Sequence, residues 1–167
     1  MRLLKFFALL ATLTVAAAAA QGALGGWGPE TPHFNLEAIL RPTAAGPDQG
    51  FGHVKFRQPN DNARIIYLDT WVRDLVAGDY LLQRQVDTDP DGDCSDAASL
   101  SPWVTLGGVS TDDRGSGRAA LSRDLDPPGP APGPPAGMQF DIHFRLVDAT
   151  TSVPVLESAC YQFTVSL

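Results

Sequence analysis

Alternation of apolar and polar residues is the feature that most constrains how this chain can fold. It is clearest over residues 138–146, where every second side chain from Met138 to Leu146 is apolar and those between, including Asp141 and His143, are polar or charged. A period of two places successive side chains on opposite faces of a β-strand. Shorter runs of the same kind recur along the chain and no stretch has a helical period. The sequence therefore predicts an all-β protein.

The number and spacing of these runs predict the architecture. We count eight strand-like runs, separated by segments rich in Gly, Pro, Asn and Asp, which favour turns. Antiparallel strands joined by such turns bury their apolar faces in a sandwich or a flattened barrel. We predict an antiparallel Greek-key β-sandwich of about eight strands, with one disulfide.

The two ends of the sequence differ in character. Residues 1–20 place two basic residues ahead of a short apolar run that ends in alanines, which is typical of an export signal, with a retained membrane anchor as the alternative. Residues 21–32 hold too much Gly and Pro for a regular element, so we expect a flexible leader. Residues 33–167 are then one β-sandwich domain of a secreted or periplasmic protein.

Charge and cysteine content limit the partners and the compartment. The formal net charge of −7 argues against nucleic acid and anionic lipid surfaces, because phosphate binding needs clustered Lys and Arg. We therefore expect an unknown protein or an envelope component as partner, no membrane span after processing, and no indication of oligomeric state. In an oxidising compartment the only two cysteines, Cys94 and Cys160, most simply form one disulfide, with two free thiols as the alternative.

The acidic loop, residues 87–98, is the one candidate metal site. It resembles the start of a calcium-binding loop, in which carboxylates at alternate positions converge on a hard cation. The twelfth position holds Ala98 where a bidentate Glu is expected, so a solvated acidic loop is the alternative interpretation. The predicted calcium ligands are Asp87, Asp89, Asp91 and Asp93.

Four short motifs follow one another along the chain. They are a Val-x-x-Leu-x-x-Gly corner (Val72, Leu75, Gly78), a long loop with a cysteine (Cys94), a Thr-Asp-x-x-Gly turn (Thr111, Asp112, Gly115) and a last strand that begins Ala-Cys (Ala159, Cys160). In this order they resemble the Cu/Zn superoxide dismutases and their non-enzymatic relatives over residues 33–167. The resemblance implies a dismutase-like sandwich, with an immunoglobulin-like one as the alternative, and a disulfide between Cys94 and Cys160.

The chemistry of that family is not implied, because its metals are held by closely spaced histidines. No histidine lies between His53 and His143 in this chain. His143 and Asp141 alternate on the outward face of one strand and are two ligands at most, so we interpret them as exposed strand residues. No serine lies in a Gly-x-Ser-x-Gly context, and no catalytic residue is identified.

These observations predict a non-catalytic exported domain that binds a partner or belongs to the cell envelope. A calcium-stabilised adhesion-type module is one alternative. A metal-dependent enzyme of the dismutase type is the other, and the histidine count argues against it.

Overall fold

A computed structural model describes residues 35–59, 64–126 and 133–166, and these residues form β-strands and connections without a helix. The predicted export signal and leader lie outside the described residues. Within the described ranges the chain forms no helix with the length and apolar character that a membrane crossing needs. The strands are β1 (Asn35–Pro42), β2 (Phe51–Arg57), β3 (Ile65–Arg73), β4 (Gly78–Asp87), β5 (Val104–Thr111), β6 (Gly117–Asp124), β7 (Gln139–Asp148), β8 (Pro154–Ser158) and β9 (Tyr161–Thr164).

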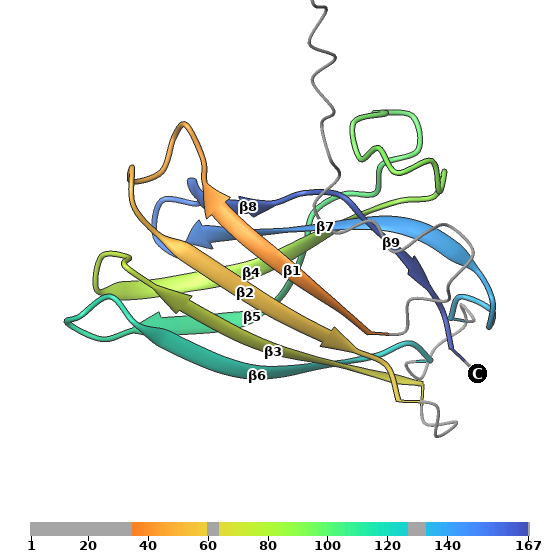
Figure 1. Cartoon of the computed structure of the whole chain (residues 1–167), viewed down its shortest axis with the longest axis horizontal. Coiled ribbons are helices and arrows are strands. Elements are labelled where there is room, and N and C mark those ends of the chain that lie inside the picture. Colours follow the sequence, from red (N-terminus) through yellow and green to blue (C-terminus); the bar gives the residue numbers. More distant parts are fainter. Residues whose placement is uncertain (1–34, 60–63, 127–132, 167) are drawn as a thin grey trace, which may run out of the picture.

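The strands close into an eight-stranded antiparallel barrel (Figure 1). Neighbours around the ring run β1, β2, β3, β6, β5, β4, β7 and β8, and β8 pairs again with β1. The ring is closed by β4 and β7, which pair over eight residues from Tyr80↔Asp148 to Asp87↔Asp141. The predicted open Greek-key sandwich is therefore wrong. Alternation buries one face of each strand in either architecture, so it cannot reveal which strand edges meet.

β9 does not add a ninth position to the ring. The carboxyl half of β7 pairs with β8 and the amino half of the same edge pairs with β9. β9 therefore continues the course of β8 after a break at Ala159 and Cys160.

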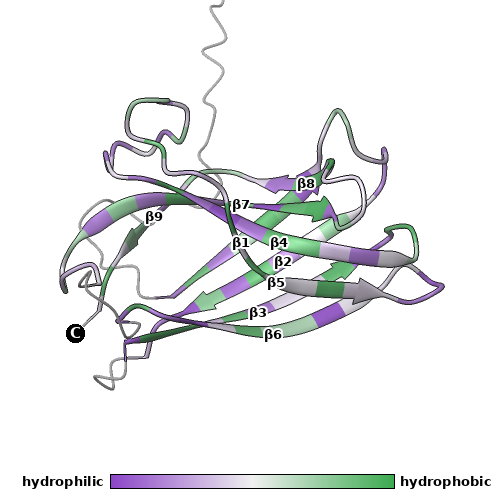
Figure 2. Cartoon of the chain, turned by 180° about the vertical axis from the view of Figure 1, so that it is seen from behind, coloured by the Kyte–Doolittle hydropathy of each residue, from purple (hydrophilic) through white to green (hydrophobic). Residues whose placement is uncertain are grey.

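The core fills the barrel with the side chains that alternation assigns to the inward face. Figure 2 shows this alternation as hydrophobic and hydrophilic bands along the strands. On β7, Phe140, Ile142, Phe144 and Leu146 are all buried. The ring of Phe56 lies 4.6 Å from that of Phe163 and 5.9 Å from that of Phe144, measured between centroids. Aromatic contacts of this kind add to the stabilisation that burial provides.

Two of the sequence motifs meet at one end of the barrel. Leu75, in the corner between β3 and β4, is buried, and its amide donates to the carbonyl of Gly115 at 3.2 Å. Gly115 lies in the turn between β5 and β6 with φ of 74°, a conformation that favours glycine. A Cβ there would lie 2.1 Å from the carbonyl oxygen of Leu75. The turn needs a glycine because the corner packs directly against it.

Replacing Gly115 with alanine should destabilise the protein by at least about 2 kcal/mol, because it combines left-handed backbone strain with a steric clash. Urea unfolding measures this. Gly78→Ala is the matched control, since a Cβ at Gly78 meets nothing within 4 Å. The control should change the free energy of unfolding by no more than about 0.5 kcal/mol. Equal effects of the two substitutions would contradict this account of the corner.

Candidate functional site

A cavity of about 420 Å³ opens inside one end of the barrel. It lies where β2, β4 and β6 end and where β3, β5 and β7 begin, the right-hand end in Figure 1 where the C-terminus lies. Most of its wall is apolar and includes Phe56, Leu68, Val86, Leu106, Met138 and Ile142. A volume of this size is within the range of small-molecule sites, roughly 300–1,000 Å³.

The cavity exists because β5 and β6 separate from each other. Their only described residue pair is Thr111↔Gly117, next to the turn that joins them. β5 remains paired with β4 as far as Arg84↔Val104, and β6 remains paired with β3 as far as Ile65↔Asp124. The two strands thus stay attached to opposite neighbours as they diverge, which leaves a space between them.

Two arginines line this mostly apolar space. Arg84 shares the inward face of β4 with Leu82 and Val86 and is half-buried, whereas Arg123 near the end of β6 is exposed. Burial lowers the pKa of the Arg84 guanidinium, and the charge of Arg123 lowers it further. Neither arginine forms an ion pair with a carboxylate of the described residues. The cavity therefore holds two arginines that form no ion pair with a described carboxylate, although the exposed Asp124 also lines it.

Sequence reasoning did not single out Arg84, although a signal was present. Arg84 is in phase with Tyr80, Leu82 and Val86, which alternation assigns to the inward face. A charged residue at an inward position is unusual, because burying a charge is costly without a partner. Because the strand phase is correct, Arg84 is a candidate ligand-binding residue.

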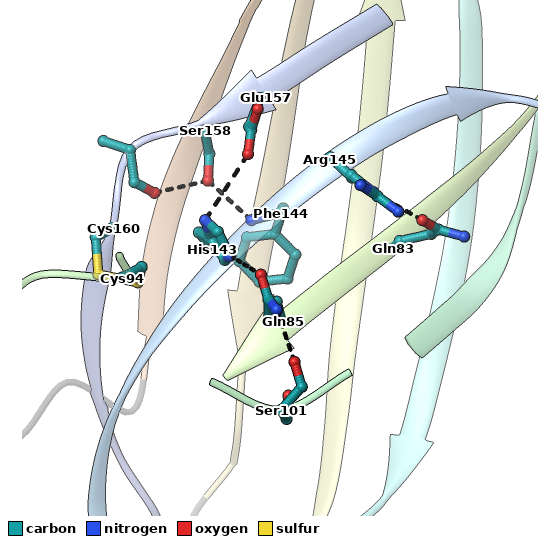
Figure 3. A network of polar contacts seen from close by, with 11 residues as sticks. Gln83, Gln85, Cys94, Ser101, His143, Phe144, Arg145, Glu157, Ser158 and Cys160 are labelled. Atoms are coloured by element: carbon teal, nitrogen blue, oxygen red, sulfur yellow. Dashed lines mark hydrogen bonds and ion pairs between the residues drawn. A yellow bond between two sulfur atoms is a disulfide. The ribbon is translucent and has the colours of Figure 1, made fainter. Parts of the chain in front are cut away.

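The acidic loop and its continuation to Trp103 contact the outer face of β4 and β7 through Gly92, Ser101 and Trp103. The ring of Trp103 stacks on that of His143 at 4.7 Å between centroids, and the guanidinium of Arg145 lies 4.0 Å from the Trp103 centroid. Beneath them, His143 Nε2 lies 2.8 Å from Gln85 Oε1, and Arg145 Nε donates to Gln83 Oε1 at 2.8 Å (Figure 3).

His143 is therefore not the exposed strand residue that the sequence predicted, because its side chain is only 12 % exposed. Burial lowers its pKa, and the charge of Arg145 acts in the same direction.

In the structure, the side chains of the four predicted calcium ligands do not converge on a common point. Asp87 is 1 % exposed, whereas Asp89, Asp91 and Asp93 are exposed. Asp91 Oδ1 accepts from the amide of Asp93 at 2.9 Å, and Asp93 Oδ2 accepts from the hydroxyl of Ser95 at 2.9 Å. Among the residues that the structure describes, no three His, Cys, Asp or Glu side chains are grouped to hold a metal ion.

Asp141 is the acidic residue that the prediction missed. It lies directly across from Asp87 in the β4–β7 pairing and is fully buried, although we predicted an exposed strand position. Its Oδ2 accepts from the amide of Gly92 at 2.5 Å, which brings the loop down onto the strand. Burial raises the pKa of Asp141, and the charges of Asp91, Asp87 and Asp89 raise it further, against the effect of the Gly92 hydrogen bond.

The predicted disulfide between Cys94 and Cys160 is present, with its Cα atoms 5.6 Å apart (Figure 3). It fastens the acidic loop to the break between β8 and β9. Gln162 supports the same attachment, because its side-chain amide donates to the carbonyl of Pro90 at 3.1 Å. A structural disulfide indicates an oxidising compartment.

Reduction of this disulfide should lower the melting temperature. The bond joins residues 66 apart in sequence, so chain entropy allows a stabilisation of up to about 4 kcal/mol. Calorimetry of the oxidised protein, the reduced protein and a Cys160→Ser variant measures this. The variant should melt with the reduced protein and should not respond to reductant. A melting temperature that is the same in all three would contradict a stabilising role for the bond.

No protein-family model, curated protein or solved structure matches this chain. The dismutase-like resemblance therefore stays a prediction.

Proposed function

We propose that this chain is a non-catalytic, exported binding protein whose barrel holds a small apolar molecule with an anionic head group. Secretion or a periplasmic location belongs to the same proposal. It is supported by the predicted export signal and by the disulfide between Cys94 and Cys160. The ligand in this proposal is a small molecule, and the expected protein or envelope partner stays a separate prediction.

The half-buried Arg84 is the observation that carries the proposal. A guanidinium cannot lose its proton in a protein, so Arg84 stays charged within an apolar wall. It has no described carboxylate partner, and the charge of Arg123 acts on it unfavourably. An anion bound in the cavity would offset both the desolvation and the repulsion. Arginine also suits a planar carboxylate, which it can bind through two parallel hydrogen bonds.

The remaining wall specifies the rest of the ligand. Apart from the arginines, Asp124 and Ser101, the lining side chains offer mainly aliphatic and aromatic surface. Asp124 Oδ1 accepts from the amide of Asp126 at 2.8 Å. A ligand that buries an apolar body here gains roughly 25 cal/mol for each Å² removed from water. A carboxylate attached to a hydrocarbon chain matches both parts of the site.

The cavity wall favours binding over catalysis. Ser101 is the hydroxyl on this wall, and it donates to the carbonyl of Pro102 and accepts from the amide of Val86. No histidine or carboxylate makes a described hydrogen bond with this hydroxyl. An activated serine requires a general base at that position.

Binding of decanoate and of its methyl ester tests the proposal, because the two share the hydrocarbon chain and differ in charge. Titration calorimetry should show that the wild-type protein binds decanoate more tightly than the ester. Arg84→Gln should lower the affinity for decanoate at least about tenfold, the loss expected when a charged hydrogen-bonding partner is removed. It should leave the affinity for the ester unchanged.

Arg118→Gln is the matched control. Arg118 is an exposed arginine on β6, the strand that also carries Arg123, but it does not line the cavity. This variant should bind decanoate like the wild type. The Arg84→Gln variant should melt no lower than the wild type without ligand, since it loses a half-buried charge. Equal affinity of the wild type for acid and ester, or no binding of either, would contradict the proposal.

A further inference from the structure

We propose that Asp87 and Asp141, together with the loop carboxylates of Asp89 and Asp91, form a site for a divalent cation of the calcium class. The site lies on the outer face of β4 and β7, beneath the acidic loop, and does not depend on the ligand-binding cavity. It differs from the sequence-predicted set by including Asp141 and leaving out Asp93, which bonds to Ser95.

Two buried carboxylates occupy directly opposed positions on the outer face of the β4–β7 ladder. Asp87 and Asp141 are cross-strand partners and are 1 % and 0 % exposed. One oxygen of each is satisfied by the loop backbone, since Asp87 Oδ1 accepts from the amide of Asp89 and Asp141 Oδ2 from that of Gly92. The other oxygens, Asp87 Oδ2 and Asp141 Oδ1, are buried without a hydrogen-bond partner among the described residues.

This arrangement is unfavourable unless something else binds there. A buried acceptor without a partner costs about 1–3 kcal/mol and more when it is charged. Like charges on directly opposed strand residues also destabilise a sheet. Two such buried acceptors at opposed strand positions, with the added repulsion of the Asp89 and Asp91 carboxylates, therefore favour the binding of a positive charge.

The described side chains do not supply that charge. None of the four carboxylates forms an ion pair with a described Lys, Arg or His. His143 is on the same strand as Asp141, but its Nε2 is held by Gln85 and its Nδ1 lies 3.9 Å from Glu157. The charge must come from a bound cation or from a proton on one carboxyl group.

A cation fits the surroundings better than a proton. A single proton neutralises one of the buried pair and leaves the repulsion from Asp89 and Asp91 in place, whereas a divalent ion attracts all four carboxylates. Calcium binds six to eight oxygens from carboxylates, backbone carbonyls and water in flexible geometry. The buried pair supplies two carboxylates, and Asp89 and Asp91 are exposed above it. To reach an ion with both oxygens, Asp91 would give up its hydrogen bond from the Asp93 amide. Magnesium requires a tighter octahedral site, which a loop of this kind does not offer.

The loop is fastened at the positions that such a site needs. Asp87 belongs to the last pair of the β4–β7 ladder, and Cys94 is bonded to Cys160. The residues between them therefore have both ends fixed above Asp141. A restrained loop loses less conformational entropy when it closes around an ion than a free one does.

Thermal unfolding and titration calorimetry with calcium chloride on the full protein test the site. The wild-type melting temperature should rise with calcium and saturate at about 1 mM or below, as expected for an extracellular module, and magnesium should have a smaller effect. Asp141→Asn keeps an oxygen for the Gly92 amide but removes the charge, so it should abolish the calcium response. Without calcium it should melt no lower than the wild type.

Two further variants keep the test decisive. Asp91→Asn, at an exposed position, should weaken calcium binding at least about tenfold even if Asp141→Asn fails to fold. Asp113→Asn, in the exposed turn between β5 and β6, should respond to calcium like the wild type. No calcium response in the wild type, or one that the Asp91 and Asp113 variants share equally, would overturn the site. If the wild type does not respond to calcium and Asp141→Asn is more stable than the wild type, a proton on one carboxyl group neutralises the buried pair.

Discussion

Pairing between β4 and β7 is the interaction on which the rest of this structure depends. It closes the ring of strands, and its eight residue pairs give each strand one face toward the core and one toward the acidic loop. The inward face carries Leu82 and Leu146 in the core and Arg84 in the cavity. The outward face carries the pairs Gln85↔His143 and Asp87↔Asp141. The two proposed sites therefore lie on opposite faces of the same two strands, the cavity on the inward face and the cation site on the outward face.

The two proposed sites also share one physical feature, a charged side chain without a described ion-pair partner. Each holds a charged side chain that is at least half-buried and forms no ion pair with a described residue: Arg84 inside the barrel and Asp141 outside it. A folded chain keeps such groups at a cost in stability, and natural proteins accept that cost mainly where a ligand offsets it. The disulfide and the stacking of Trp103 on His143 hold the loop in place over one of these sites.

Sequence patterns predicted the strands and the cross-link but not how the strands close. Alternation identified the buried side chains of β7, because burial on one face follows from a period of two. Two cysteines in a chain with a predicted export signal were enough to predict the Cys94–Cys160 bond. The barrel was missed because strand edges meet through long-range pairing, on which alternation carries no information. Asp141 was missed for a related reason, since its burial comes from a loop that packs on the outer face and not from its own strand.

Backbone NMR of the isotopically labelled protein tests the central claim most directly, because closure of the ring and the position of both sites rest on one ladder. The account predicts nuclear Overhauser contacts between the main chains of Leu82 and Leu146, of Val86 and Ile142, and of Asp87 and Asp141. A ring opened into two sheets can keep this ladder, but it would lose the pairs that join β1 to β8 (Leu40↔Ser158) and β5 to β6 (Thr111↔Gly117), so contacts across these two seams are predicted as well. The absence of these contacts in a protein that keeps the other strand pairs would contradict the barrel and both sites with it.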